Sequence, residues 1–117
     1  MKKNFYALGR LKTGTMNKTE AEYAKHLDDL KLCGDVIWYK FEGVKLRLTD
    51  NTFYSPDFAV MTRNGLIELH EVKGARAIFQ DDAKVKIKVA AELYPFVFIA
   101  VFPIPKKKGG GWEFEQF

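Results

Sequence analysis

Two short motifs bring together the side-chain types that can hold a divalent metal ion beside a phosphate. The first is Pro56-Asp57, and the second is Glu71-Val72-Lys73 further along the chain. Hard cations such as Mg²⁺ need oxygen ligands and keep several waters, so two or three carboxylates are enough to bind them. Such an ion polarises a phosphate and lowers the pKa of an attacking water, and a second cation such as Lys73 helps the nucleophile. The residue types therefore indicate metal-assisted hydrolysis of a phosphodiester.

The two motifs fall on neighbouring strand-like segments. Residues 53–61 and 66–73 are rich in apolar strand formers and flank Arg63-Asn64-Gly65, which is a strong hairpin signal. Side chains two apart on a strand share a face, so Glu71 and Lys73 are expected to point the same way.

The length of the turn decides whether the two carboxylates meet. Asp57 lies opposite Glu71 if the loop has three residues and Gly65 takes the left-handed position of a bulged turn. A two-residue loop would instead pair Asp57 with Val72 and send the carboxylates to opposite faces. The site hypothesis therefore predicts the three-residue turn.

A third carboxylate is expected at the start of a helix over residues 17–32. Asn17 is a good N-cap and Glu20 lies three residues on, which is a capping-box arrangement. With a period of 3.6 residues, Glu20 shares a side with the apolar stripe, whereas Glu22 falls on a solvated face. Glu20 could reach a metal held by the strands, or it could only complete the capping box, and both interpretations stay open.

A second helix is expected over residues 81–94, although its centre alternates like a strand. Asp81 and Asp82 suit a helix N-terminus, and Ala90-Ala91-Glu92-Leu93 has good helix propensity. On this helix Lys86 lies inside the apolar arc, so its side chain must either reach past it to solvent or meet a carboxylate or phosphate. Lys86 is therefore a candidate to face the site.

The remaining segments predict the other strands of the sheet. They are residues 36–41, 44–48, 96–102 and 112–117. The order helix, four strands, helix, two strands is typical of an α/β or α+β fold with a mixed sheet. A chain of 117 residues is the size of one domain.

The charge distribution is uneven, within a net charge of +4 and a pI near 9.1. The segment before Glu20 has five cations and no acid: Lys2, Lys3, Arg10, Lys12 and Lys18. This basic arm could contact phosphates or could be a solvated terminus, and composition does not separate the two. No apolar run is long enough for a membrane span and the N-terminus has no signal-peptide core, so we expect a soluble cytoplasmic protein.

The cysteine and histidines do not indicate a metal site. Cys33 is the single cysteine, which suggests a reducing compartment, and we interpret it as a small core residue. His26, His70 and Cys33 lack zinc spacing. His70 alternates with Glu71, so we expect it on the opposite face, packed or hydrogen-bonded.

The motifs resemble those of the PD-(D/E)XK nuclease superfamily over about residues 17–103. The residues that carry the resemblance are Glu20, Tyr54-Ser55-Pro56-Asp57-Phe58 and His70-Glu71-Val72-Lys73-Gly74. Residues 17–23 and 82–88 are also similar to a family of small phage-associated nucleases. Archaeal Holliday junction resolvases are similar in size and layout.

This resemblance implies a fold and a ligand set. Residues 17–117 would form one nuclease domain with a restriction-endonuclease-like core, a mixed β-sheet flanked by helices, after a basic arm of residues 1–16. Asp57 and Glu71 would hold Mg²⁺ or Mn²⁺ together with the Val72 carbonyl, and Glu20 would ligate directly or through water. Lys73 would position or activate the attacking water.

The resemblance also implies a partner, which is DNA. The residues expected to contact phosphates are Arg10, Lys12, Lys18, Arg76 and Lys86, with Lys106, Lys107 and Lys108 as a remote contact. A homodimer would supply two active sites for two strands, which suits branched DNA such as a Holliday junction. The alternatives are a DNA-binding or assembly protein without catalysis, a single-strand or flap nuclease, and an RNA-directed nuclease. A phage-encoded protein would act in the cytoplasm of its host.

Overall fold

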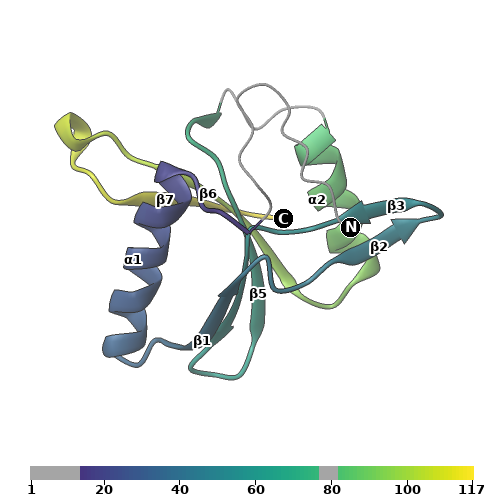
Figure 1. The fold of residues 1–117 in the computed structure, drawn as a ribbon, viewed down its shortest axis with the longest axis horizontal. Coiled ribbons are helices and arrows are strands. Elements are labelled where there is room, and N and C mark those ends of the chain that lie inside the picture. The colour runs from purple at the N-terminus through teal and green to yellow at the C-terminus, as the bar shows by residue number, and fades with distance from the viewer. Residues whose placement is uncertain (1–13, 77–81) are drawn as a thin grey trace, which may run out of the picture.

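The computed structural model describes residues 14–76 and 82–117, in which a mixed β-sheet carries helices on its faces (Figure 1). In chain order the elements are α1 (Lys18–Leu32), β1 (Val36–Phe41), β2 (Leu46–Thr49), β3 (Thr52–Tyr54), β4 (Phe58–Thr62), β5 (Ile67–Val72), α2 (Asp82–Leu93), β6 (Val97–Pro103), the short 3₁₀ helix η2 (Lys106–Lys108) and β7 (Trp112–Gln116). Arg10 and Lys12 of the expected basic arm, and Asp81 of the expected helix start, lie outside the described residues.

The main sheet has five strands in the order β1-β4-β5-β6-β7. Strands β5 and β6 are parallel and are joined through α2, while the other neighbours are antiparallel. A tight turn reverses the chain direction and can join only antiparallel strands. Parallel neighbours therefore need a longer crossover connection. The expected class, an α/β (α+β) chain with a mixed sheet, is confirmed.

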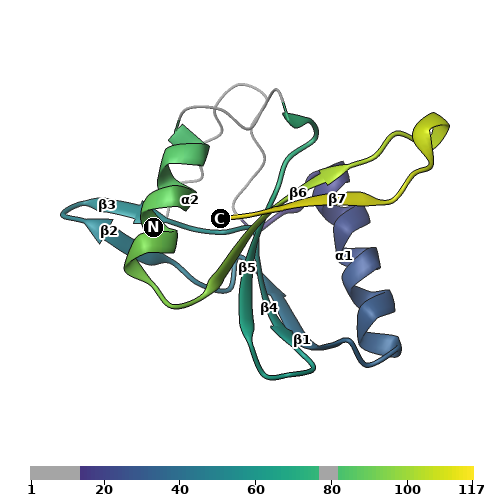
Figure 2. The same ribbon diagram turned by 180° about the vertical axis from the view of Figure 1, so that it is seen from behind.

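The helices cover opposite faces of this sheet, as the front and back views show (Figures 1 and 2). Helix α1 buries Tyr23 and Leu27 against one face, together with Phe58 of β4. Helix α2 buries Ile87 against the other face, beside the small two-stranded sheet formed by β2 and β3. Because successive residues of a strand face opposite sides, β5 presents Leu69 to the α2 side.

The prediction of a single strand over residues 53–61 is wrong. The chain breaks at Ser55-Pro56-Asp57, so that β3 pairs with β2 in the small sheet and only β4 joins the main one. Proline has no N–H to donate to a ladder, and Pro56 is buried where the chain passes from one sheet to the other. This break places Asp57 at the entry to β4.

The first helix begins as predicted and ends with a correction. Asn17 caps α1 and forms the capping box with Glu20. Cys33, expected in the core, is exposed at the C-terminal end of α1, where the chain turns away through Gly34 at a φ of +87°. A helix end that projects into solvent exposes its last side chains, whatever their apolarity.

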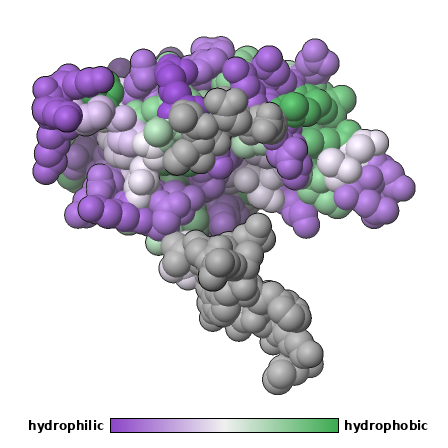
Figure 3. Space-filling view, turned by 90° about the horizontal axis from the view of Figure 1, so that it is seen from above, coloured by the Kyte–Doolittle hydropathy of each residue, from purple (hydrophilic) through white to green (hydrophobic). Residues whose placement is uncertain are grey.

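Helix α2 confirms the helical interpretation of its segment, but its apolar arc is only partly covered. Ile87 and Ala90 are buried, whereas Val85, Val89 and Leu93 are exposed. Figure 3 shows apolar surface at the end of the molecule that carries α2 and the β2–β3 sheet, with mostly hydrophilic surface elsewhere on that face. Within the described ranges neither helix combines the length and apolarity that crossing a bilayer requires.

Candidate functional site

The turn between β4 and β5 has the three-residue form that the site hypothesis requires. The strands pair with Phe58 opposite His70 and Met61 opposite Ile67. The Thr62 N–H donates to the Leu66 carbonyl at 2.9 Å, which leaves residues 63–65 as the loop. Gly65 has a φ of +80° and donates its N–H to the Thr62 carbonyl at 2.9 Å. The predicted left-handed glycine and bulged turn are confirmed.

This register sets Asp57 opposite Glu71, one residue before β4 begins. The Val72 N–H donates to Asp57 Oδ2 at 2.8 Å, so the Asp57 carboxylate is tied to the strand that carries Glu71. Burial raises the pKa of the Asp57 carboxyl well above its usual range, and the negative charge of Glu71 raises it further. The hydrogen bond from Val72 acts in the opposite direction. The two carboxylates are therefore close enough to repel each other.

Glu71 is buried between a tyrosine and a lysine. Its relative exposure is 6%; the Tyr54 hydroxyl donates to its Oε1 at 2.9 Å, and Lys73 Nζ lies 3.2 Å from its Oε2. The expectation that Glu71 and Lys73 share a face is confirmed. Burial raises the pKa of the Glu71 carboxyl, while Lys73 and the Tyr54 hydroxyl act to lower it. Both oxygens of this carboxylate are thus held in place.

Glu20 completes the capping box and also acts on the two site carboxylates. Its Oε1 accepts from the Asn17 N–H at 2.9 Å, and its own N–H donates to Asn17 Oδ1 at 2.8 Å. Its negative charge contributes to raising the pKa of both Asp57 and Glu71. No three Asp, Glu, His or Cys side chains within residues 14–76 and 82–117 converge as a metal-holding group. The capping role is therefore confirmed, and ligation by Glu20 stays a prediction.

Lys86 borders the same cavity as Glu71. This cavity of about 360 Å³ is lined by Phe53, Tyr54, Ser55, Glu71, Asp82, Ala83 and Lys86. Lys86 comes from the first turns of α2 and is half-buried. Lys86 also lines a second cavity, formed with Leu48 and Val89, so its direction toward the site stays a prediction.

The other predicted phosphate contacts are scattered. Lys18 is exposed in the first turn of α1, and Lys106–Lys108 form η2, at the tip of the long β6–β7 connection in Figure 1. Arg76 is held by β7: its guanidinium bonds Glu113 and Glu115 at 3.2 and 2.7 Å. The structure does not bring these cations to one surface with Lys86.

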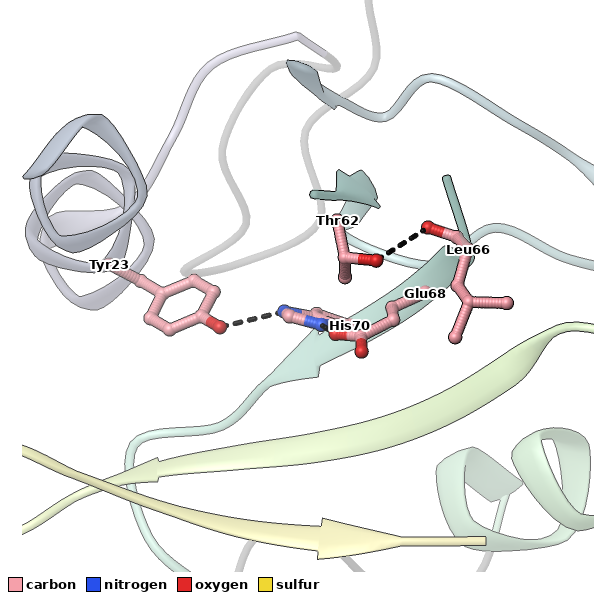
Figure 4. Close-up of polar contacts among 5 residues, drawn as sticks. All are labelled: Tyr23, Thr62, Leu66, Glu68 and His70. Carbon is pink, nitrogen blue, oxygen red and sulfur yellow. Dashed lines mark hydrogen bonds and ion pairs between the residues drawn. The ribbon is translucent and has the colours of Figure 1, made fainter. Parts of the chain in front are cut away.

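A buried hydrogen-bond chain lies on the opposite face of β5, next to α1 (Figure 4). The Tyr23 hydroxyl is 2.7 Å from His70 Nδ1, and His70 Nε2 is 2.9 Å from Glu68 Oε1. This confirms the expected position and hydrogen bonding of His70. Sequence reasoning missed Tyr23 and Tyr54 as partners, because a tyrosine on an apolar face has the same periodicity whether or not its hydroxyl is used.

The donor set at Asp57 and Glu71 fits a hard divalent cation. Burial raises the pKa of both carboxyls although Lys73 lies beside Glu71, so a bound cation would offset negative charge that this lysine balances only in part. Lys73 donates its N–H to the Val101 carbonyl, so the polar backbone groups of Val72 face the other way, toward Asp57. Two carboxylates and one carbonyl are the oxygen ligands that Mg²⁺ or Mn²⁺ takes while keeping water.

Comparison of the chain with protein-family models, with curated proteins and with solved structures found no significant match.

Proposed function

We propose that this chain is a metal-dependent DNA endonuclease with a restriction-endonuclease-like PD-(D/E)XK core. The observation that carries the proposal is the pairing of Asp57 with Glu71 across β4 and β5, with Lys73 Nζ 3.2 Å from the Glu71 carboxylate. A surface ion pair of Glu71 and Lys73 would not account for the burial of Glu71 or for its hydrogen bond from Tyr54. The resemblance of the motifs to that superfamily supports the same assignment.

Each residue of the set has a role that its contacts support. Asp57, Glu71 and the Val72 carbonyl would hold Mg²⁺ or Mn²⁺, with Glu20 ligating directly or through water. The bound ion would polarise the scissile phosphate and lower the pKa of the attacking water. Lys73 would hold that water or a phosphate oxygen, since its ammonium already lies against the site. Tyr54 and the Val72 N–H would keep the carboxylates oriented.

The charges around the site support a nucleic-acid substrate. Lys86 shares the cavity of Glu71, and Lys18 lies exposed two residues before Glu20. We assign the substrate as DNA and the acting species as a homodimer, in which two such sites would cut two strands of a branch. Arg10 and Lys12 would extend the phosphate contacts along the arm.

Cleavage assays test this proposal directly. Labelled linear, single-stranded, flap and four-way-junction DNA, with RNA versions of the first two, are incubated with Mg²⁺, Mn²⁺ or EDTA. We expect cutting of DNA that depends on metal and is lost in Asp57→Ala and Lys73→Ala. Asp35→Ala, an exposed carboxylate paired with Arg63, is the matched control and should cut like the wild type.

Three results would change the assignment. Cutting that survives Asp57→Ala would place the catalytic site elsewhere. Metal-independent DNA binding without any cutting would indicate an assembly or DNA-binding protein on this fold. Preferential cutting of RNA would change the assigned substrate from DNA to RNA.

A further inference from the structure

The outer face of the β2–β3 sheet carries an aromatic ring among cations. Phe53 is 39% exposed although its neighbour Tyr54 is buried, because the two side chains point to opposite faces of β3. Arg47 of β2 is the cross-strand partner of Phe53, and Lys45 Nζ lies 4.6 Å from the centre of the Phe53 ring. We call Lys45, Arg47 and Phe53 the hairpin surface.

The hairpin surface is continuous with the candidate site. Phe53 lines the cavity of about 360 Å³ that also contains Glu71 and Lys86. Ser55 lines this cavity and a second one of about 510 Å³, whose wall includes Lys45. Ser55 therefore borders both cavities, with Lys45 in the wall of one and Phe53 and Glu71 in the wall of the other, and either cavity is in the size range of small-ligand pockets.

The charges around these two cavities favour a polyanion. Lys45, Arg47 and Lys86 form no ion pair with any carboxylate in the described part of the chain. The acids on the cavity walls besides Glu71 are Glu42, whose Oε1 accepts from the Gly14 N–H, and Asp82. The cations beside the ring are thus available to phosphates.

We propose that Phe53 is a stacking platform for an unpaired base of the DNA strand whose phosphate enters the Asp57–Glu71 site. Lys45 and Arg47 hold the phosphates that flank this base. A base inside a continuous duplex has both faces covered, so the exposed Phe53 ring beside the cavity would stack on a nucleotide that has left the helix. The substrate class is then DNA with single-stranded nucleotides at the cut: a single strand, a flap or an open junction. This inference rests on the proposed function for its choice of DNA.

The test is a binding measurement in EDTA, so that it does not depend on cleavage. The full chain is titrated with a short single-stranded oligonucleotide, the same strand with abasic sites, and the corresponding blunt duplex. The variants are Phe53→Ala, Phe53→Leu and Phe53→Trp. Phe114→Ala is the matched control, since Phe114 is 49% exposed on β7 with its ring near His26 of α1.

Stacking on Phe53 has a specific signature. Phe53→Ala and Phe53→Leu should weaken binding of the intact single strand by about tenfold, with little change for the abasic strand or the duplex. Phe53→Trp should bind like the wild type, and its added fluorescence should be quenched by the intact strand. Phe114→Ala should bind every probe normally.

The inference is overturned if Phe53→Ala weakens all three probes equally, if it behaves like Phe114→Ala, or if the wild type binds no single strand. It fails separately from the nuclease assignment. If the wild type cuts DNA with metal but Phe53→Ala leaves DNA binding unchanged, only the stacking proposal is lost. If binding of the single strand depends on Phe53 but no metal supports cutting, only the nuclease proposal is lost.

Discussion

Asp57 Oδ2 accepts the backbone N–H of Val72 at 2.8 Å, so one site carboxylate is fixed by the strand that carries the other. This bond is independent of the identity of the Val72 side chain, because only the backbone takes part. The relative position of the two carboxylates is therefore set by strand register, and the acids remain close although their charges repel.

Asp57→Asn should remove a pH-dependent loss of stability. Burial raises the folded pKa of Asp57 above the value of about 3.9 for an unfolded chain. Such a group contributes stability that is complete below the unfolded pKa and is lost as pH rises through the folded pKa. In EDTA, the advantage of Asp57→Asn over the wild type should grow from about pH 4 toward alkaline pH. The asparagine can still accept from Val72, so the hydrogen bond is retained.

Urea denaturation across this pH range measures the effect. Asp35→Asn, at an exposed carboxylate, is the control and should show a difference that varies little with pH. A difference for Asp57→Asn that stays constant with pH would show that Asp57 is charged at no penalty in the folded chain.

Substitutions of Glu20 separate capping from metal binding. Glutamine at N3 can keep the bond to the Asn17 N–H but removes the charge, so Glu20→Gln should leave the melting temperature nearly unchanged. If Glu20 ligates the metal directly or through water, Glu20→Gln should weaken Mn²⁺ binding by about tenfold to a hundredfold, measured calorimetrically. Glu20→Ala should in addition lose about 0.5–1 kcal/mol of stability.

Glu22→Gln is the matched control, because Glu22 is exposed on the same helix. Equal Mn²⁺ affinity of Glu20→Gln and the wild type would reduce Glu20 to its role in the capping box.

Tyr23→Phe should destabilise the α1 side of the sheet by about 1–3 kcal/mol. Burial raises the pKa of the Tyr23 hydroxyl far above its usual value, so the hydroxyl stays protonated and can donate to His70 Nδ1. A His70 ring that accepts at Nδ1 carries a proton on Nε2, 2.9 Å from the Glu68 carboxylate. Removing the hydroxyl leaves a buried Nδ1 without this partner.

Equilibrium denaturation compares this variant with Tyr39→Phe, whose hydroxyl donates to the exposed Asp28. The Tyr39 substitution should lose less than about 1 kcal/mol, because water can replace its bond. Equal losses in the two variants would mean that the Tyr23–His70–Glu68 chain adds no stability beyond an exposed hydrogen bond.

Gly65→Ala should lose about 1–2 kcal/mol through the backbone alone. The φ of Gly65 is +80°, and a Cβ added there meets no atom within 4 Å, so crowding does not contribute. Gly65→Asn should lose less, because asparagine tolerates the left-handed region. Thermal denaturation checks the order glycine, asparagine, alanine, and Asn64→Ala in the same turn should lose less than about 0.5 kcal/mol. A fully stable Gly65→Ala would contradict the bulged turn.

Local patterns predicted the parts of this protein that depend on near neighbours in the chain. The capping box of Asn17 and Glu20, the left-handed Gly65 and the shared face of Glu71 and Lys73 each involve residues a few positions apart. Backbone dihedral preferences and the periods of helix and strand govern such features, so the sequence carries their signal directly. The register of β4 against β5 belongs to the same class, since a short turn sets it.

Tertiary structure decided the contacts between distant segments. The chain passes from the small sheet back into the main sheet at Ser55-Pro56-Asp57, which lets Tyr54 reach Glu71 and sets Phe53 beside the cavity. Likewise β7 places its acids beside Arg76. These pairings depend on how the β5–α2–β6 crossover and the small sheet pack on one face. Such packing involves many side chains that are distant in the sequence, so the periodicity of a single segment does not predict it. The sequence alone predicted Asp57, Glu71 and Lys73 as candidate site residues, whereas only the folded chain showed which side chains hold and surround them.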